Sequence, residues 1–244
     1  MADPNTPGDV RVGCCGFPLS LRRYAEEFSV VEVQQTFYQP PMPGTLEKWR
    51  AAVPAGFEFT LKAWQLITHE ASSPTYRRLR EELSSQQRRE AGAFRLNTTV
   101  MSAWRRALEC ARTLGSRSIL FQCPARFAPT PTNKTNVRDF FREIKPEPLT
   151  CVWEPRGKWQ AEEVRELCHE LGLVHGVDPF QQIPVAGPFG YFRLHGRTGY
   201  RYRYSDQDLE QLREMAGKHA LCYVLFNNIS MLEDARRFQR LVVS

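Results

Sequence analysis

Three residues of the sequence have side chains suited to moving protons, and they occupy comparable positions. Glu32, Glu154 and His195 each lie at or near the end of a short run of apolar, β-branched and aromatic residues. Carboxylates and imidazoles are the usual general acids and bases of enzymes. We therefore predict that these three residues carry acid–base catalysis, provided that the fold brings the ends of their runs together.

Cationic and amide side chains occur at equivalent positions in the same or in other runs. Arginine side chains bind phosphate and carboxylate groups through paired hydrogen bonds, and a lysine adds a point charge. Several cations that converge on one place would therefore indicate an anionic substrate. The residues predicted to bind the substrate are the cations and amides Lys62, Gln122, Arg156, Arg193 and Asn227, together with Asp178, which ends another run.

Two further segments have side chains that could reach the same place. Residues 200–204 alternate tyrosine and arginine, and Tyr200 could stack on a base while the arginines meet phosphates. The alternative is a solvated loop whose tyrosines pack on the rim. His69 follows another apolar run and is either a loop anchor or a proton shuttle. The remaining histidines fall on helical or helix-facing positions and are predicted to be structural: His169, His175 and His219.

Short apolar runs alternate with charged, amphipathic stretches along the chain. The runs predicted to be strands are 10–14, 30–36, 57–63, 116–122, 150–156, 173–178, 191–195 and 221–227. The stretches predicted to be helices are 44–53, 101–114, 136–144, 160–171, 205–216 and 230–241. Successive strand residues point to opposite faces, so Phe59 and Leu61 face helices while Lys62 points the other way. The same count places on the inner face Glu32, Gln122, Glu154, Arg156, Asp178, Arg193, His195 and one of Asn227 and Asn228.

Eight strands that alternate with helices over 244 residues match an α/β fold, the eight-stranded parallel β/α (TIM-like) barrel. In such barrels the C-terminal ends of the strands hold the active site. A doubly wound parallel sheet is the alternative. We predict a single barrel domain over residues 9–244, preceded by a flexible tail at 1–8. An extended helical insertion is predicted at about 64–115, whereas the segment after Asp178 is too rich in Pro and Gly for a helix.

The composition is that of a folded domain, with 42% hydrophobic residues, 25% charged residues and a net charge of +6. No apolar stretch is long enough for a membrane span, and the polar start of the chain does not resemble a secretory signal, so a cytoplasmic protein is expected. The seven cysteines form no C-x-x-C motif and are predicted to be free thiols. Cys14 and Cys15 are neighbours on a strand and must point to opposite faces.

A divalent metal ion is an alternative use of the acidic residues. The oxygen and nitrogen ligands on offer are those of Glu32, Glu154, Asp178 and His195. The nearby lysine and arginines would repel a cation unless they lie a few ångström away. The sequence therefore predicts no certain cofactor, with a metal as the alternative.

Segments in a fixed order along the chain resemble the motifs of the domain-of-unknown-function 72 family, in its archaeal-type branch. They are GCCGF (13–17), VEVQQTFYQPP (31–41), FTLKAWQLITH (59–69), ILFQCPARFAPT (119–130), WEPRGKW (153–159), YFRLHGRTGY (191–200), YSDQDL (204–209) and FNNISMLEDARRF (226–238). The resemblance implies a β/α barrel and a pocket of motif residues, which adds Tyr38 and His69 to the substrate-binding set. The family has no settled activity, and its likeness to endonuclease-like and sugar-isomerase-like barrels is an analogy.

From these observations we predict an enzyme, a hydrolase of the phosphodiesterase type, with its site at the C-terminal mouth of the barrel. Its substrate is predicted to be an anionic, phosphate-bearing molecule, either a nucleic acid or a phosphosugar. The alternatives are a non-catalytic nucleic-acid-binding barrel and a metal-dependent sugar isomerase or epimerase. The expected partner is an anionic small molecule or a nucleic acid, not a membrane, and the oligomeric state is unknown. No P-loop, dinucleotide fingerprint or nucleophile elbow occurs, which disfavours ATP, NAD and α/β-hydrolase chemistry.

Overall fold

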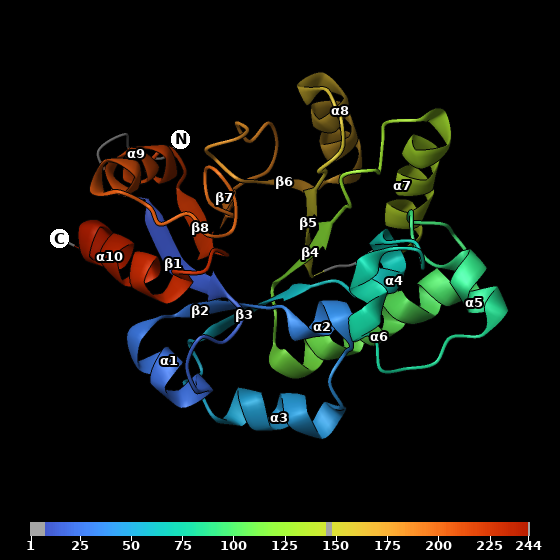
Figure 1. Ribbon diagram of the computed structural model, residues 1–244, viewed down its shortest axis with the longest axis horizontal. Helices are drawn as coiled ribbons and strands as arrows, with labels where there is room; N and C mark the ends of the chain where they lie inside the picture. The colour runs from blue at the N-terminus through green and yellow to red at the C-terminus, as the bar shows by residue number, and fades with distance from the viewer. Residues whose placement is uncertain (1–7, 145–147, 244) are drawn as a thin grey trace.

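The computed structural model describes residues 8–144 and 148–243, and in these residues eight parallel strands close a barrel in chain order (Figure 1). The strands are β1 (Asp9–Cys15), β2 (Val30–Val33), β3 (Glu58–Lys62), β4 (Ser118–Gln122), β5 (Thr150–Glu154), β6 (Val174–Val177), β7 (Gly190–Leu194) and β8 (Leu221–Phe226). Strand β8 pairs with β1 and closes the circle, with Phe226 opposite Cys14. The predicted β/α barrel is confirmed, and the doubly wound sheet is excluded.

Helices connect the strands and surround the barrel, as Figure 1 shows. They are α1 (Leu21–Glu27), α2 (Gln35–Tyr38), α3 (Pro43–Ala51), α4 (Gln65–Thr68), the 3-10 helix η1 (Pro74–Arg78), α5 (Ser85–Glu90), α6 (Thr98–Leu114), α7 (Pro131–Ile144), α8 (Ala161–Leu171), α9 (Asp206–Ala216) and α10 (Met231–Val243). Helix α6 begins where the Asn97 side chain accepts a hydrogen bond from the Val100 N–H, and it ends at Gly115 in the left-handed conformation. Of the tail predicted at residues 1–8, all but Gly8 lies outside the described residues.

Two strands, β2 and β5, end two or more residues earlier than the sequence predicts. Strand β2 stops at Val33 because residues 35–38 turn into α2, where the Thr36 hydroxyl donates to the carbonyls of Val33 and Lys62. A side chain that bonds the backbone in this way competes with the strand ladder. Strand β5 stops at Glu154, which leaves Arg156 in the following loop rather than on the strand.

The long connection between β3 and β4 holds α4, η1, α5 and α6, as its length predicts. Between β6 and β7, residues 178–189 form no helix, in agreement with their Pro and Gly content. Helices α1 and α2 are absent from the sequence prediction, because stretches of seven and four residues are too short to show a helical period. None of the helices in the described residues is long and apolar enough to cross a membrane. The cytoplasmic location stays a prediction.

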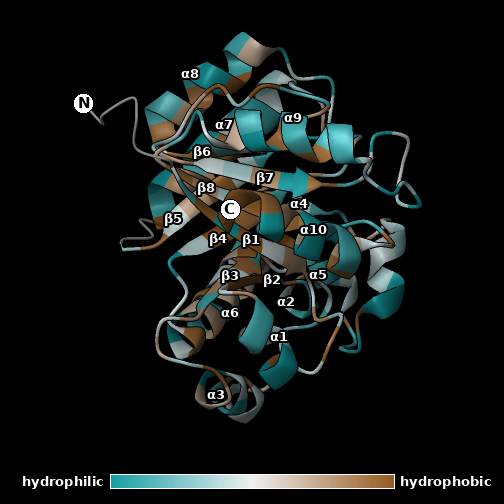
Figure 2. Ribbon diagram, turned by 90° about the vertical axis from the view of Figure 1, so that its left-hand side faces the viewer, coloured by the Kyte–Doolittle hydropathy of each residue, from teal (hydrophilic) through white to brown (hydrophobic). Residues whose placement is uncertain are grey.

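Two apolar layers hold the barrel together. The outer layer, between strands and helices, includes Phe59, Leu61 and Trp153, and the inner layer, inside the barrel, includes the buried residues Val30, Leu120, Val152, Val174 and Leu225. Cys14 belongs to the outer layer and Cys15 to the inner one, as strand alternation requires. Figure 2 shows the contrast between hydrophobic strands and the hydrophilic surface of the surrounding helices. The inner layer fills the barrel below the C-terminal mouth and supports the polar residues there.

Candidate functional site

A buried polar network lies inside the barrel near the C-terminal ends of its strands, with Arg193 of β7 at its centre. The Arg193 guanidinium is fully buried; its Nε donates to Glu32 Oε2 at 3.0 Å and its Nη2 to Glu32 Oε1 at 2.8 Å. Its Nη1 donates to Glu154 Oε2 at 2.7 Å. One cation therefore bridges two buried carboxylates that come from β2 and β5. Close pairing of this kind is what offsets the cost of removing the charges from water.

Glu154 stays ionised although it is buried. Burial by itself would raise the pKa of this carboxyl, but Arg193 and the contact with His195 hold it well below its usual range. His195 Nε2 lies 3.3 Å from Glu154 Oε1, and Arg156 Nε lies 3.6 Å from the same oxygen. Glu154 is thus a permanent acceptor at neutral pH, suited to orienting an imidazole rather than to giving up a proton.

Glu32 has further donors around it. The Tyr191 hydroxyl donates to Glu32 Oε2 at 2.8 Å and lies 3.0 Å from the Thr60 hydroxyl. The side-chain amide of Gln34 donates to the other oxygen of Glu32. Burial raises the pKa of Tyr191 well above its ordinary value, which keeps its proton available for this hydrogen bond. These contacts fix Glu32 under Arg193.

Lys62, the last residue of β3, is also buried and is less cationic than a surface lysine. Its Nζ donates to Gln122 Oε1 at 2.7 Å, and the Gln122 amide donates in turn to Glu154 Oε1 at 2.8 Å. The same Nζ lies 3.8 Å from the centre of the Phe37 ring. Burial, with the repulsion of Arg193, lowers the pKa of Lys62 to about 7. At neutral pH this amine is therefore charged for only part of the time.

Above this network lies a cavity of about 540 Å³. The predicted residues that line it are Glu154, Arg156, Asp178, His195, Tyr200 and Asn227. Glu32, Lys62, Gln122 and Arg193 are buried and do not line it. The cavity also has lining residues that sequence reasoning missed, namely Gln181, Gln182 and Arg197. They lie in the loops after β6 and β7, where no period reveals which side chains point inward.

His195 connects the groups on the cavity wall. Its Nδ1 lies 3.1 Å from the side-chain nitrogen of Asn227, and its backbone N–H donates to Asp178 Oδ2 at 3.0 Å. Nε2 lies 3.3 Å from Glu154 Oε1 and also 3.3 Å from Nη1 of Arg193, which can only donate. With Asn227 as a donor to Nδ1, the proton of the neutral ring is assigned to Nε2, where Glu154 is the acceptor within reach. Burial raises the pKa of Asp178. The two carboxyls on this wall are therefore pushed toward opposite ionisation states.

Tyr38 and His69, which the resemblance adds to the substrate-binding set, lie outside the lining of the cavity. The Tyr38 ring is covered by the guanidinium of Arg78, whose Cζ lies 3.5 Å from the ring centre. His69 is buried; its Nδ1 lies 2.8 Å from the Thr68 hydroxyl, and burial lowers its pKa to about 3. A neutral imidazole packed in this way is typical of a loop anchor.

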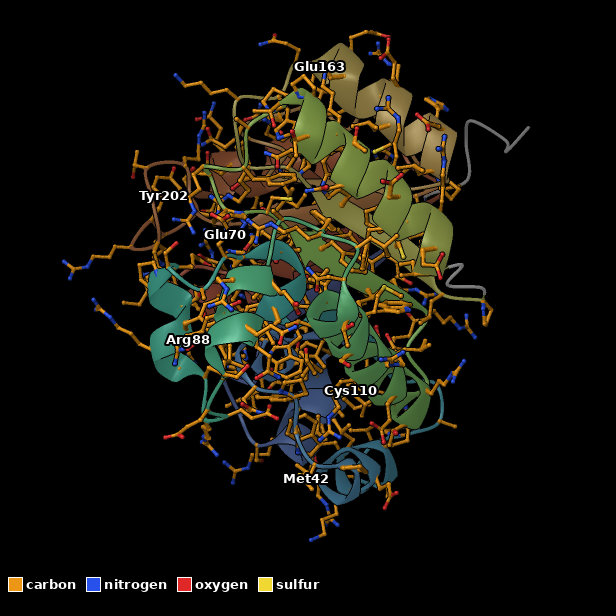
Figure 3. All side chains as sticks on the ribbon, turned by 90° about the vertical axis from the view of Figure 1, so that its right-hand side faces the viewer. Met42, Glu70, Arg88, Cys110, Glu163 and Tyr202 are labelled. Carbon is orange, nitrogen blue, oxygen red and sulfur yellow. The ribbon has the colours of Figure 1, made fainter. Side chains whose placement is uncertain are left out.

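The loop after β7 presents one of its three tyrosines to the cavity. Tyr200 is 60% exposed and lines the cavity. The Tyr202 hydroxyl donates to Asp208 Oδ2 at 2.6 Å, and the buried Tyr204 hydroxyl accepts the Gly196 N–H at 2.8 Å. Figure 3 shows Tyr202 on the same side of the molecule as Glu70, which follows α4. Of the tyrosines at 200, 202 and 204, Tyr200 is the one placed to stack on a ligand.

The acidic residues of the mouth do not form a cluster of metal ligands. Within residues 8–144 and 148–243, no three His, Cys, Asp or Glu side chains are grouped so as to hold a metal ion. Both oxygens of Glu32 and one oxygen of Glu154 accept hydrogen bonds from Arg193, and the other oxygen of Glu154 accepts one from Gln122. The metal alternative stays untested.

Solved structures with the same fold cover almost the whole chain. A DUF72 family protein from Enterococcus faecalis V583 is 22% identical, with a TM-score of 0.72 over 97% of this chain and 98% of that one. A DUF72 family protein from Thermotoga maritima MSB8 is 20% identical, with a TM-score of 0.69 over 97% and 100%. A xylose isomerase domain containing protein from Salmonella typhimurium LT2 is 12% identical, with a TM-score of 0.58 over 93% and 92%. At these identities the similarity concerns the fold.

The family follows from the sequence itself. No curated protein matches the chain. The family described as "Protein of unknown function DUF72" matches residues 16–244, which include every barrel strand after β1 and most of the candidate site. The resemblance of the sequence motifs is thereby confirmed, while the archaeal-type branch stays a prediction. The chain belongs to the DUF72 family of β/α barrels.

Proposed function

We propose that this protein is an enzyme that cleaves or rearranges a phosphate-bearing anionic substrate by acid–base chemistry at the mouth of the barrel. The observation that carries the proposal is the linkage of two carboxyls through one histidine. His195 touches Glu154 with its ring and Asp178 with its backbone N–H, and all three line the same cavity. Neighbouring carboxyls whose pKa values are pushed apart are a recurrent arrangement for an acid and a base.

The arginines at the rim supply the affinity for an anion. The Arg156 side chain is 47% exposed and lies beside Glu154 at 3.6 Å, a loose contact that leaves most of its donors free. Arg197 also lines the cavity, although its Nη1 is held by Asp208 at 2.6 Å. A guanidinium next to a cavity binds phosphate oxygens through charge-assisted hydrogen bonds. We therefore assign Arg156 as the principal phosphate-binding residue, with Arg197 beside it.

Phosphodiester hydrolysis is the reaction that these groups suit best. His195 Nδ1, exchanging Asn227 for a water molecule, accepts the proton of the attacking water, and ionised Glu154 stabilises the imidazolium that forms. Asp178, whose pKa burial raises although its two oxygens accept the N–H groups of Phe180 and His195, is assigned as the donor of a proton to the leaving alkoxide. Glu32, which the sequence proposes as catalytic, lies under Arg193 and is assigned a positioning role. One proton is taken from water and one is returned to the leaving group.

The proposal is tested with bis(4-nitrophenyl) phosphate as the probe and the release of 4-nitrophenolate as the readout. His195→Gln is expected to lower kcat by about 10²–10⁴-fold, because it removes the group that accepts the proton of the attacking water. Asp178→Asn is expected to lower kcat much less with this probe, because 4-nitrophenolate leaves readily without a proton. Arg156→Ala is expected to raise KM by about tenfold, the effect of losing one charged hydrogen bond. Arg105→Ala, on the exposed part of α6, is the matched control and should change neither constant.

Two outcomes would contradict the proposal. Equal kcat in wild type and His195→Gln would remove His195 from the reaction. The second outcome is that the wild type binds the diester without turnover and that Arg156→Ala weakens this binding. The protein would then be a non-catalytic binding barrel and not an enzyme.

A further inference from the structure

A second cavity, of about 420 Å³, lies outside the barrel wall between β5, β6 and α8. Its walls are mainly apolar and include Pro155, Trp159, Val164, Ile183 and Val185. Trp159 is held rigidly, because its Nε1 donates to the Phe127 carbonyl at 2.7 Å and its ring stacks on that of Phe127. Figure 1 shows α8 beside β5 and β6, on the outer side of the strands. A preformed apolar cavity with a fixed aromatic wall has the character of a small-molecule site.

The cavity contains one polar group that lacks a partner. His175 lines it and is 3% exposed, and its Nδ1 accepts the Val185 N–H at 3.3 Å. Burial lowers the pKa of His175 to about 4, so the ring is neutral at pH 7 and its proton is on Nε2. Within the described ranges 8–144 and 148–243, this Nε2 has no hydrogen-bond partner. A buried donor without an acceptor is costly, and a ligand that offers an acceptor would relieve that cost.

The second cavity adjoins the first. Pro155 and Gln182 line both, so the two cavities lie on either side of these residues. Arg156, the proposed phosphate-binding residue, directly follows Pro155 in the chain. On the outer rim, Ile183 is 82% exposed, an apolar side chain that faces solvent next to an apolar cavity. A molecule bound at the mouth could therefore extend past Gln182 and cover Ile183.

We infer that the second cavity binds an uncharged aromatic group that carries a hydrogen-bond acceptor, and that this group belongs to the substrate whose phosphate occupies the mouth. The inference rests on the proposed function. It narrows the substrate class to phosphate esters with an aryl or heteroaryl group. Trp159 supplies the stacking wall, Ile183 packs against the ring at the outer rim, and His175 Nε2 donates to the acceptor. Phosphosugars without such a group would leave the cavity empty and bind more weakly.

Isothermal titration calorimetry on the full chain tests the inference with phosphonates, which cannot be hydrolysed. The probes are methylphosphonate, 4-acetylbenzylphosphonate and 4-isopropylbenzylphosphonate, of which the last two differ chiefly in the acceptor oxygen. We expect the acetyl probe to bind at least tenfold more tightly than methylphosphonate, and severalfold more tightly than the isopropyl probe. Equal affinities for methylphosphonate and the acetyl probe would overturn the inference.

Two variants locate the binding. Ile183→Asp changes an exposed loop residue, so the fold should persist, and it is expected to lower the affinity for both aryl probes at least fivefold while leaving methylphosphonate unchanged. His175→Phe is expected to abolish the preference for acetyl over isopropyl. Met42→Asp, the same change at an exposed apolar residue before α3, is the control and should alter no affinity. An Ile183→Asp variant with wild-type affinity for the aryl probes would exclude this cavity.

The same measurements distinguish a failure of the proposed function from a failure of the aromatic site. If methylphosphonate does not bind the wild type but the uncharged ketone 4′-methylacetophenone does, and Ile183→Asp weakens the ketone, the aromatic site stands and the phosphate site falls. If methylphosphonate binds and Arg156→Ala weakens it while the aryl groups add nothing, the phosphate site stands and the aromatic site falls. Absence of binding by all four probes would overturn both.

Discussion

Arg193 and Glu32 form a two-pronged ion pair across the inside of the barrel. Nε and Nη2 of the guanidinium lie 3.0 and 2.8 Å from the two carboxylate oxygens, and neither side chain reaches solvent. Strands β7 and β2, which hold the two residues, are separated in the barrel by β8 and β1. The pair therefore ties two non-adjacent strands together beneath the candidate site, and it leaves Nη1 of Arg193 to donate to Glu154.

Arg193→Met is expected to lower the free energy of unfolding by about 3–5 kcal/mol, because it leaves two buried carboxylates without their cation. Urea denaturation followed by circular dichroism measures the loss. Arg105→Met on the exposed face of α6 removes the same charge and should change stability by no more than about 0.5 kcal/mol. A loss of less than about 1 kcal/mol in Arg193→Met would show that the network does not depend on the guanidinium.

The lowered pKa of Lys62 predicts that the free energy of unfolding rises at alkaline pH. Burial lowers its pKa to about 7 in the folded protein, whereas the unfolded chain has an ordinary lysine pKa of about 10.4. Below pH 7 both states carry the charge, and the full cost of burying it is present. Between the two pKa values the unfolded state binds more protons, so the free energy of unfolding rises with pH.

The comparison with Lys62→Met isolates this effect from other titrating groups. Between pH 8 and 10, the stability of the wild type minus that of the variant should rise by on the order of 1.4 kcal/mol per pH unit. Chemical denaturation at each pH supplies the difference. Lys48→Met, an exposed lysine of α3, is the control, with an expected effect of at most about 0.5 kcal/mol. A difference that stays constant with pH would mean that Lys62 titrates alike in both states.

Strand alternation predicts the barrel and the inward direction of Glu32, Lys62 and Arg193, because one apolar face per strand leaves the other face for polar groups. Strand alternation does not predict how deeply each of these side chains is buried. Apart from Glu154 and Val177, the last residues of β5 and β6, the cavity is lined by residues of the loops beyond the strands, such as Arg156. Residues further inside the strands cover one another. Which cation pairs with which carboxylate depends on the register of the strands around the barrel. A single sequence contains no signal for that register.

The loop that brings Arg197 and Tyr200 to the cavity depends on Gly196. Its φ is +88°, and a Cβ there would lie 2.2 Å from the Gly199 carbonyl oxygen. Gly196→Ala is therefore expected to destabilise the protein by at least roughly 1–2 kcal/mol, the cost of the left-handed region for an L residue, and to weaken methylphosphonate binding by displacing Arg197. Gly44→Ala in α3 meets no atom within 4 Å and has no such φ, so it should instead stabilise by roughly 0.5–1 kcal/mol. Thermal and urea denaturation of the two variants measure these opposite signs. A Gly196→Ala protein as stable as the wild type would show that the loop can be rebuilt without this turn, and the position of Arg197 would then not depend on it.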